Sequence, residues 1–342
     1  MISEKKIAEI RELLNASQNP LFFFDNDPDG LSSFLLLRRY INNGKGIVIK
    51  SFPELNASYA RRLEEFKPDY IFILDKPLID PVFIEEAKQR GIRIVWIDHH
   101  PPQQIEGINY FNPLLEEPYS NEPVAYWCQK IANKKENMWI SVIGCLGDWY
   151  MPEFYKEFAK DYPDIASEKI EKASEALYTT KIGKLAKVLS FALKDTTTNV
   201  IKMLKFLIAV KTPYEALEEN AKNKSIYDRY NQINRKYTKL IEKANSIVSE
   251  KMLFFQYGGD LSISGELANE LFFSNQDKVV CVAYLRGNEA TMSFRGVIDI
   301  REKVVEAMKG IEGRSGGHKN ACAAKISVED LPKLKENLEK II

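Results

Sequence analysis

The 342-residue sequence predicts an α/β protein with a parallel-sheet domain, a helical connector, and a second, smaller α/β domain. Over the first 150 residues, short apolar runs alternate with amphipathic stretches, which is typical of a parallel sheet covered on both faces. The pattern is helical from about residue 152 to 251, and strand-like runs return from residue 252. We therefore expect domains at 1–185 and 251–342, joined by a connector at 186–250.

The first domain is expected to contain four strands and four helices in alternation. The strands are predicted at 21–24, 46–50, 70–74 and 92–97, and the helices up to residue 14 and at 31–41, 59–66 and 81–90. Asn42-Asn43-Gly44 and Gly91 end two of these helices. Three of the strands run into acidic or imidazole side chains. Ligands of open parallel sheets bind at the carboxyl ends of the strands, so we expect these side chains to converge.

The second half of the chain is expected to begin with one long helix, from Asn223 to Glu250. Strands are then predicted at 252–257, 278–285 and 289–294, followed by a final helix after residue 328.

Composition excludes several classes of protein. The formal net charge is zero, which disfavours a protein that coats duplex nucleic acid non-specifically. No apolar run reaches the length of a membrane span, and the charged amphipathic start does not resemble a secretory signal. The four cysteines are widely spaced and form no CxxC pair, so we expect neither zinc nor disulfides, and a cytoplasmic location.

Three acidic residues follow the first predicted strand, in the order Asp25, Asp27 and Asp29. One of them could simply cap the following helix, since Asp is favoured there. Capping needs only one of the three, however, and clustered carboxylates repel one another unless a cation is present. The motif therefore favours a cation site.

Further candidate ligands end later strands or lie in apolar runs. Asp75 follows one strand, Asp98-His99-His100 follows the next, and Asp148 lies in the run GCLGDW. His99 and His100 are two of only three histidines in the chain. A set rich in oxygen and poor in nitrogen, without thiolate, suits Mn²⁺ or Mg²⁺, and the histidine favours Mn²⁺. The number of ligands predicts two ions, which can clamp a phosphoryl group.

Taken together, these motifs resemble those of the DHH phosphoesterases: DNDPDG, the Asp ending YIFILD, IDHH, and the GD of GCLGDW occur in the family's order and at similar spacing. The segment Gly313–Ala321, GRSGGHKNA, looks like the GGGHxxA signature of the domain that follows the DHH domain. Thr291–Arg295 resembles the S-x-R strand before that signature. Within the family, the chain looks like the compact nano-RNase-like and archaeal RecJ-like members.

The resemblance implies a role for each motif residue. It implies ligands for two Mn²⁺ ions, with Asp75 bridging: Asp25, Asp27 and Asp75 for one, and Asp29, Asp75, His99 and Asp148 for the other. Asp98 would orient His99, and His100 would stabilise charge near the phosphate or assist proton transfer. The second domain would close over the active-site cleft. There, a phosphate or terminal nucleotide would be bound by Arg295, Ser315, Gly316, Gly317, His318 and Asn320.

The sequence departs from the family pattern in three places. Ser315 replaces the first glycine of the usual triplet, and Ala323-Ala324 stands where a glycine is common. Asp25 occupies a position at which many relatives have histidine. Asp ligates Mn²⁺ equally well, so only substrate size and end preference are affected.

The implied function is a Mn²⁺-dependent phosphodiesterase or exonuclease that hydrolyses single-stranded DNA or RNA, or short oligonucleotides, to mononucleotides. One alternative is a phosphodiesterase or phosphatase for cyclic dinucleotides or 3′-phosphoadenosine 5′-phosphate. Another is a RecJ-like, non-catalytic component of a replication helicase complex, and an active enzyme could also have such a partner. Oligomeric state and cleavage polarity are not readable from the sequence.

Overall fold

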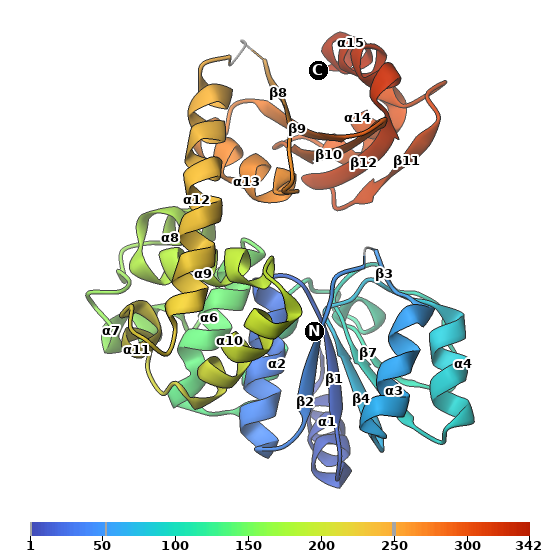
Figure 1. The fold of residues 1–342 in the computed structure, drawn as a ribbon, viewed down its shortest axis with the longest axis vertical. Helices are drawn as coiled ribbons and strands as arrows, with labels where there is room; N and C mark the ends of the chain where they lie inside the picture. Colours follow the sequence, from blue (N-terminus) through green and yellow to red (C-terminus); the bar gives the residue numbers. More distant parts are fainter. Residues whose placement is uncertain (1, 52, 248–250) are drawn as a thin grey trace. The chain divides into compact units, whose positions relative to one another are not determined.

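A computed structural model describes residues 2–51, 53–247 and 251–342. The chain forms two compact units, Met1–Tyr230 and Asn231–Ile342 (Figure 1).

A five-stranded parallel sheet forms the centre of the first unit, in the order β2-β1-β4-β6-β7. Its strands are β1 (Leu21–Asp25), β2 (Lys45–Ile49), β4 (Tyr70–Leu74), β6 (Arg93–Ile97) and β7 (Asn109–Phe111). A separate parallel pair joins β3 (Glu54–Leu55) to β5 (Leu78–Ile79). Because β2 and β4 lie on opposite sides of β1, the strand order reverses at β1, and this switch point is where open α/β sheets bind ligands. The predicted α/β fold, with a parallel sheet in the first domain, is confirmed.

Helices cover both faces of this sheet (Figure 1). One face packs against α1 (Glu4–Ala16), α2 (Pro28–Ile41), α5 (Val124–Ala132) and α6 (Met138–Gly147), and the other against α3 (Arg61–Phe66) and α4 (Pro81–Gln89). Successive side chains of a strand point to opposite faces. Phe22 and Phe24 therefore join the first core, whereas Phe23 contacts Phe83 of α4 in the second, with ring centroids 5.4 Å apart.

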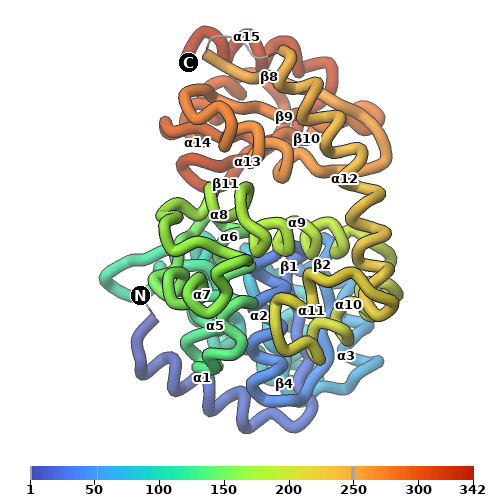
Figure 2. Tube along the Cα trace, turned by 90° about the vertical axis from the view of Figure 1, so that its left-hand side faces the viewer, coloured from blue at the N-terminus to red at the C-terminus, as the bar shows by residue number. Residues whose placement is uncertain are grey.

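Further helices extend the first core (Figure 2). They are α7 (Tyr155–Asp161), α8 (Ala173–Thr179), α9 (Lys181–Leu193), α10 (Thr197–Ala209) and α11 (Pro213–Leu217), with short 3-10 helices at Ala57–Ala60, Pro113–Leu115 and Lys135–Asn137. Leu189 of α9 and Leu204 of α10 are buried in this core. Arg39 of α2 donates to the carbonyls of Leu207 and Val210, and so binds the carboxyl end of α10, where carbonyls lack helical partners.

The long helix predicted from Asn223 to Glu250 is observed as α12 (Lys224–Asn245), and residues 248–250 of that prediction lie outside the described residues. A mixed sheet then follows in the order β11-β12-β10-β9-β8, in which only β8 and β9 pair in parallel. Its strands are β8 (Met252–Gly258), β9 (Val279–Arg286), β10 (Glu289–Arg295), β11 (Gly313–Gly317) and β12 (Ala321–Ser327). The first three were predicted, but β11 and β12 were not.

Helices α14 (Ile300–Ala307) and α15 (Leu331–Ile341) cover one face of the second sheet, and the 3-10 turn Val328–Asp330 leads into α15. Met292 and Phe294 are buried on this face with Val304. Helix α13 (Ser264–Ser274) contacts β9 and β10. The Ser264 hydroxyl lies 3.0 Å from that of Ser293, which alternates with Met292 and Phe294, so α13 covers the opposite face.

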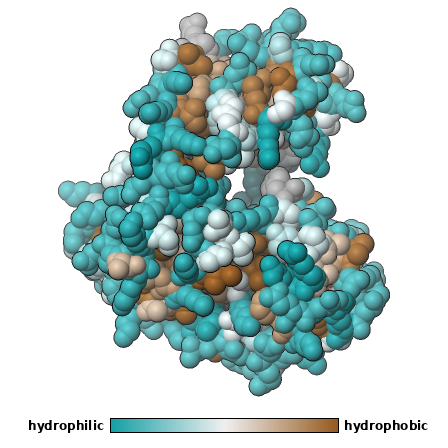
Figure 3. Space-filling view, in the orientation of Figure 1, coloured by the Kyte–Doolittle hydropathy of each residue, from teal (hydrophilic) through white to brown (hydrophobic). Residues whose placement is uncertain are grey.

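The outer surface in view is mainly hydrophilic, with small apolar patches on each unit (Figure 3). Among the described residues, no helix combines the length and apolar character needed to span a membrane.

Candidate metal centre

The loop from β1 into α2 carries the first predicted ligands. Asp25 is the last residue of β1, and Asp27 caps α2 by accepting a hydrogen bond from the Gly30 amide at 2.9 Å. A Cβ atom at Gly30 would lie 2.6 Å from the backbone nitrogen of Asp25, so only glycine lets α2 start this close to the strand. Burial, followed by the charge of Asp25, raises the pKa of Asp27 to about 6.

Asp29 is fully buried and accepts two backbone hydrogen bonds from the start of α5. Its carboxylate oxygens lie 2.8 Å from the Val124 amide and 2.7 Å from the Ala125 amide. Burial and the charges of Asp148 and Asp27 nevertheless raise its pKa well above the usual value. A carboxylate has about four lone-pair sites, so these two hydrogen bonds leave Asp29 able to ligate a cation as well.

Asp75 follows β4 and is 1% exposed. Neither of its carboxylate oxygens accepts a hydrogen bond from the described residues, although the Nε2 atom of His99 lies 3.4 Å from Oδ1. Its φ of 56° is left-handed, a conformation that costs energy and is concentrated at functional sites. A hydrogen bond between the Asp27 and Asp75 carboxyl groups requires a proton on one of them. A bound cation would instead stabilise both groups as carboxylates.

His99 and His100 follow β6 and have different partners. The Nε2 atom of His99 lies 3.2 Å from Oδ2 of Asp148 as well as near Asp75. Asp98 is fully buried and holds His100 instead: its Oδ1 is 2.9 Å from His100 Nδ1, and its Oδ2 accepts the His100 amide at 3.0 Å. The expectation that Asp98 orients the His99 ring is therefore wrong, because the short contact goes to the ring of His100.

Burial alone would lower the pKa of His100, but the hydrogen bond and charge of Asp98, followed by the charges of Asp27 and Asp25, raise it above the usual value. The pKa of Asp98 is itself raised by burial, against the hydrogen bond from His100. The His100 side chain is 25% exposed, whereas that of Asp98 is not exposed. His100 is therefore the member of this pair that a substrate can reach.

Asp148 caps the carboxyl end of α6, and its side chain is 25% exposed. The preceding Gly147 lies against Pro28, where a Cβ atom would come within 2.8 Å of the proline Cβ. The following residue, Trp149, has a left-handed φ of 58°. Loss of surrounding water, followed by the charges of Asp27, Asp25 and Asp98, raises the pKa of Asp148.

These side chains form two overlapping groups whose ligand atoms lie within 4.8 Å of one another: Asp75 with His99 and His100, and Asp29 with His99 and Asp148. Burial and mutual repulsion raise the pKa values of Asp29 and Asp75, and the Asp75 oxygens accept no hydrogen bond from the described residues, so a cation between these carboxylates would stabilise their ionised forms. The donors are carboxylates and imidazoles without thiolate, which fits Mn²⁺ or Mg²⁺. The site can therefore hold a divalent cation.

Two residues of this site were missed in the sequence. The Nζ atom of Lys76 lies 2.8 Å from Oδ1 of Asp25. Asn112, just after β7, donates to the carbonyl of His100 at 2.8 Å and so supports the histidine loop. The available signals were the lysine directly after Asp75 and the asparagine after a short apolar run.

The predicted substrate residues of the second unit come from two neighbouring strands and a turn. Ser315, Gly316 and Gly317 lie in β11, the exposed edge strand, and a Cβ atom at Gly317 would lie 2.7 Å from the Ala321 carbonyl. His318 and Ala321 close a turn through two backbone hydrogen bonds. The residues around this turn have internal partners: Asn320 donates to the Gly296 carbonyl at 2.9 Å, and Arg295 donates to Asn269 Oδ1 at 2.5 Å.

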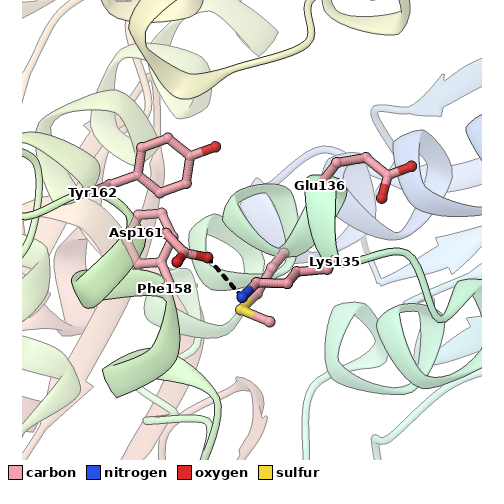
Figure 4. A pocket seen from close by; sticks show the side chains of 6 residues that line it. Lys135, Glu136, Phe158, Asp161 and Tyr162 are labelled. Carbon is pink, nitrogen blue, oxygen red and sulfur yellow. Dashed lines mark ion pairs between the residues drawn. The ribbon is translucent and has the colours of Figure 1, made fainter.

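A separate hollow of about 360 Å³ contains none of the predicted site residues (Figure 4). It is lined by Lys135, Glu136, Met138, Phe158, Asp161 and Tyr162. Lys135 pairs across it with Asp161 at 3.1 Å and also with Glu157 at 2.8 Å. These exposed ion pairs show no converging set of reactive groups, so we do not regard the hollow as a candidate site.

Family models match both units of the chain. The DHH family N-terminal domain matches residues 21–146, and the DHHA1 domain matches residues 244–342. The chain is thus a DHH-family protein with a C-terminal DHHA1 domain, as the motifs predicted.

Solved structures share this fold at low sequence identity. RecJ of Thermus thermophilus in complex with Mn²⁺ is 14% identical, with a TM-score of 0.69 over 98% of this chain and 54% of that one, so this chain spans about half the length of that RecJ. A pGpG-specific phosphodiesterase of Vibrio cholerae is 11% identical, with a TM-score of 0.51 over 95% and 99% of the two chains. CDC45 of Entamoeba histolytica is 10% identical, with a TM-score of 0.51 over 98% of each chain. No curated protein matches the sequence.

Proposed function

We propose that this protein is a divalent-cation-dependent phosphodiesterase that hydrolyses single-stranded nucleic acid or short oligonucleotides to mononucleotides, with Mn²⁺ as its preferred ion. The observation that carries the proposal is the cluster around the buried His99, whose Nε2 atom lies 3.4 Å from Asp75 Oδ1 and 3.2 Å from Asp148 Oδ2, at the switch point of the sheet. The similar structures include a RecJ solved with Mn²⁺ and also with Mg²⁺, and a pGpG phosphodiesterase.

Asp75, His99 and Asp148 would hold the cation, with Asp27 and Asp29 close to them. A bound divalent cation supplies Lewis-acid chemistry, since it neutralises charge on a phosphoryl group and lowers the pKa of water. At Asp25, the Nζ atom of Lys76 already lies 2.8 Å from Oδ1.

His100 is placed to handle a proton. Asp98 accepts the hydrogen bond from its Nδ1 atom, so Nε2 is the atom that can face a substrate. The hydrogen bond to Asp98 stabilises the protonated ring, and a proton on Nε2 can stabilise charge on a non-bridging oxygen or pass to the leaving oxygen. Asn112 keeps the loop in place by bonding the His100 carbonyl. We assign His100 as the general acid, with Asp98 as its positioning residue.

The second unit would contribute contacts to phosphate. The exposed edge strand β11 presents Ser315, Gly316 and Gly317 without bulky side chains, and backbone amides of such segments bind anions. His318 and Arg295 would add positive charge to this surface.

The test is hydrolysis of 5′-labelled RNA and DNA, from dinucleotides to oligomers of about twenty nucleotides, with Mn²⁺. We expect cleavage that His99→Ala abolishes and that the surface variant Glu85→Gln preserves. Turnover of a cyclic dinucleotide or of 3′-phosphoadenosine 5′-phosphate, without cleavage of oligomers, would move the proposal to those substrates. No turnover of any phosphoester with Mn²⁺ would refute an enzymatic role and favour the alternative of a non-catalytic component of a replication complex.

A further inference from the structure

A buried lysine lies within the candidate metal centre. The Lys76 side chain is fully buried, and its Nζ atom lies 2.8 Å from Asp25 Oδ1 and 2.8 Å from the Ser51 carbonyl. The Asp25 side chain is 17% exposed. Lysine is almost never fully buried unless it is paired. The pairing partner here is one of the carboxylates that the family motif assigns to a metal ion.

The backbone around Lys76 fixes the position of its ammonium group. The Lys76 carbonyl accepts a hydrogen bond from Trp96 Nε1 at 3.0 Å. The Trp96 ring is buried and stacks on Tyr110 at a centroid distance of 3.9 Å. On either side of Lys76, Asp75 has its left-handed φ and Pro77 has a restricted one. The ammonium group is therefore held in place from both its backbone and its side chain.

The carboxylates of the centre differ in their positively charged and hydrogen-bonding partners. Asp25 has a fixed cation at hydrogen-bonding distance, whereas the oxygens of Asp75 accept no hydrogen bond from the described residues. The two overlapping groups of potential metal ligands contain Asp29, Asp75, His99, His100 and Asp148, and neither group contains Asp25. An ammonium group also repels a divalent cation placed on the same carboxylate. A divalent cation is therefore expected to bind near Asp75 and not at Asp25.

We propose that the Lys76 ammonium group takes the place of one of the two cations expected from the family motif, so that the centre binds a single divalent ion at Asp75, His99 and Asp148. The inference rests on the proposed metal-dependent function and adds the number of ions to it. Lys76 then acts as a built-in positive charge at the Asp25 end. Because its side chain is fully buried, it acts through Asp25 and not by touching substrate.

A competing arrangement assigns Lys76 a purely supporting role. In that arrangement, Lys76 would orient Asp25 through Oδ1 while Oδ2 still held a second ion. The two arrangements differ in the number of ions bound, which can be measured without any substrate.

The experiment counts Mn²⁺ ions on the full chain by native mass spectrometry and calorimetric titration, with electron paramagnetic resonance to detect coupling between two ions. We expect one equivalent and an uncoupled spectrum for the wild type. The neutral variant Lys76→Met is expected to take up two equivalents and give a coupled spectrum. Lys88→Met removes the same charge from a lysine whose side chain is 37% exposed, and is expected to bind one equivalent.

The number of bound ions distinguishes failure of the Lys76 assignment from failure of the proposed function. Two coupled ions on the wild-type protein would overturn the Lys76 assignment and leave the proposed function intact, whereas no bound ion would overturn both. A folded Lys76→Met variant that still binds one ion would also overturn the assignment, because the lysine would not be what excludes the second. If Lys76→Met does not fold, Lys76→Gln replaces it, and the wild-type spectrum still decides between one ion and two.

Discussion

Binding of a cation should stabilise the first unit, and Asp75 should be the residue on which this stabilisation most depends. Asp75 is 1% exposed and its carboxylate oxygens lack hydrogen-bond donors among the described residues. In the absence of metal, burial and the charges of Asp29, Asp27 and Asp148 raise its pKa and disfavour its ionised form. A cation removes this penalty in the folded state alone, so Mn²⁺ should raise the melting temperature.

The size of the effect follows from mass action. At an Mn²⁺ concentration about 100 times Kd, the gain in the free energy of unfolding is about 2.7 kcal/mol. For a unit of this size, residues 1–230, 1 kcal/mol corresponds to roughly 2–4 °C, so we expect a rise of about 5–10 °C. Asp75→Asn should remove most of that rise. Without metal, the same variant should melt above the wild type, because one buried negative charge has been removed.

The assay is thermal unfolding followed by circular dichroism, with Mn²⁺ or with chelator. Glu85→Gln is the matched acid-to-amide control, since the Glu85 side chain is 64% exposed, and its response should equal that of the wild type. An equal Mn²⁺-dependent rise in Asp75→Asn and the wild type would refute the reasoning. A metal-free Asp75→Asn that melts below the wild type would refute the claim that this buried charge is uncompensated.

Three further predictions address the acid, the loop and the thiols. His100→Asn should lower kcat by roughly 10²–10⁴-fold yet keep the Mn²⁺-dependent rise in melting temperature, a pattern that kinetics and unfolding together would reveal. Gly30→Ala should lower the free energy of unfolding in urea by about 1–3 kcal/mol, because the new Cβ atom would lie 2.6 Å from the backbone nitrogen of Asp25. Unchanged stability would contradict this close approach of α2 to β1. The four cysteines are buried with raised pKa values, so iodoacetamide should label none of them at pH 8 before unfolding and all four in urea.

Much of the first unit could be predicted because its strands are nearly continuous apolar runs. Strands buried on both faces leave this pattern, and each of the runs at 21–24, 70–74 and 92–97 became a strand of the parallel sheet. The acidic residues that follow them lie at one edge because parallel strands share their direction. The local sequence was therefore sufficient to predict that Asp75 and His99 lie close together.

The pairing inside the site could not be predicted, because it depends on contacts between distant segments. Asp29 bonds to amides 95 and 96 positions further along the chain, at the start of α5. Asp98 has two adjacent histidines after it, and only the turn of the loop decides that His100 is its partner. Lys76 was missed in the sequence, because its burial beside Asp25 depends on β1 lying next to β4.

The second unit shows a different limit. Strand β11 is Gly-Arg-Ser-Gly-Gly, a composition that is unfavourable for strands, and it is a strand only because it pairs with β12. The sequence identified this segment as a family signature without predicting its structure. The roles of Arg295 and His318 in substrate binding stay predictions.

The most direct test of the account is to locate Mn²⁺ in crystals of the protein by anomalous scattering. We expect a peak in contact with Asp75, His99 and Asp148. No peak beside these residues in crystals grown with Mn²⁺, or ions bound only elsewhere on the chain, would contradict it.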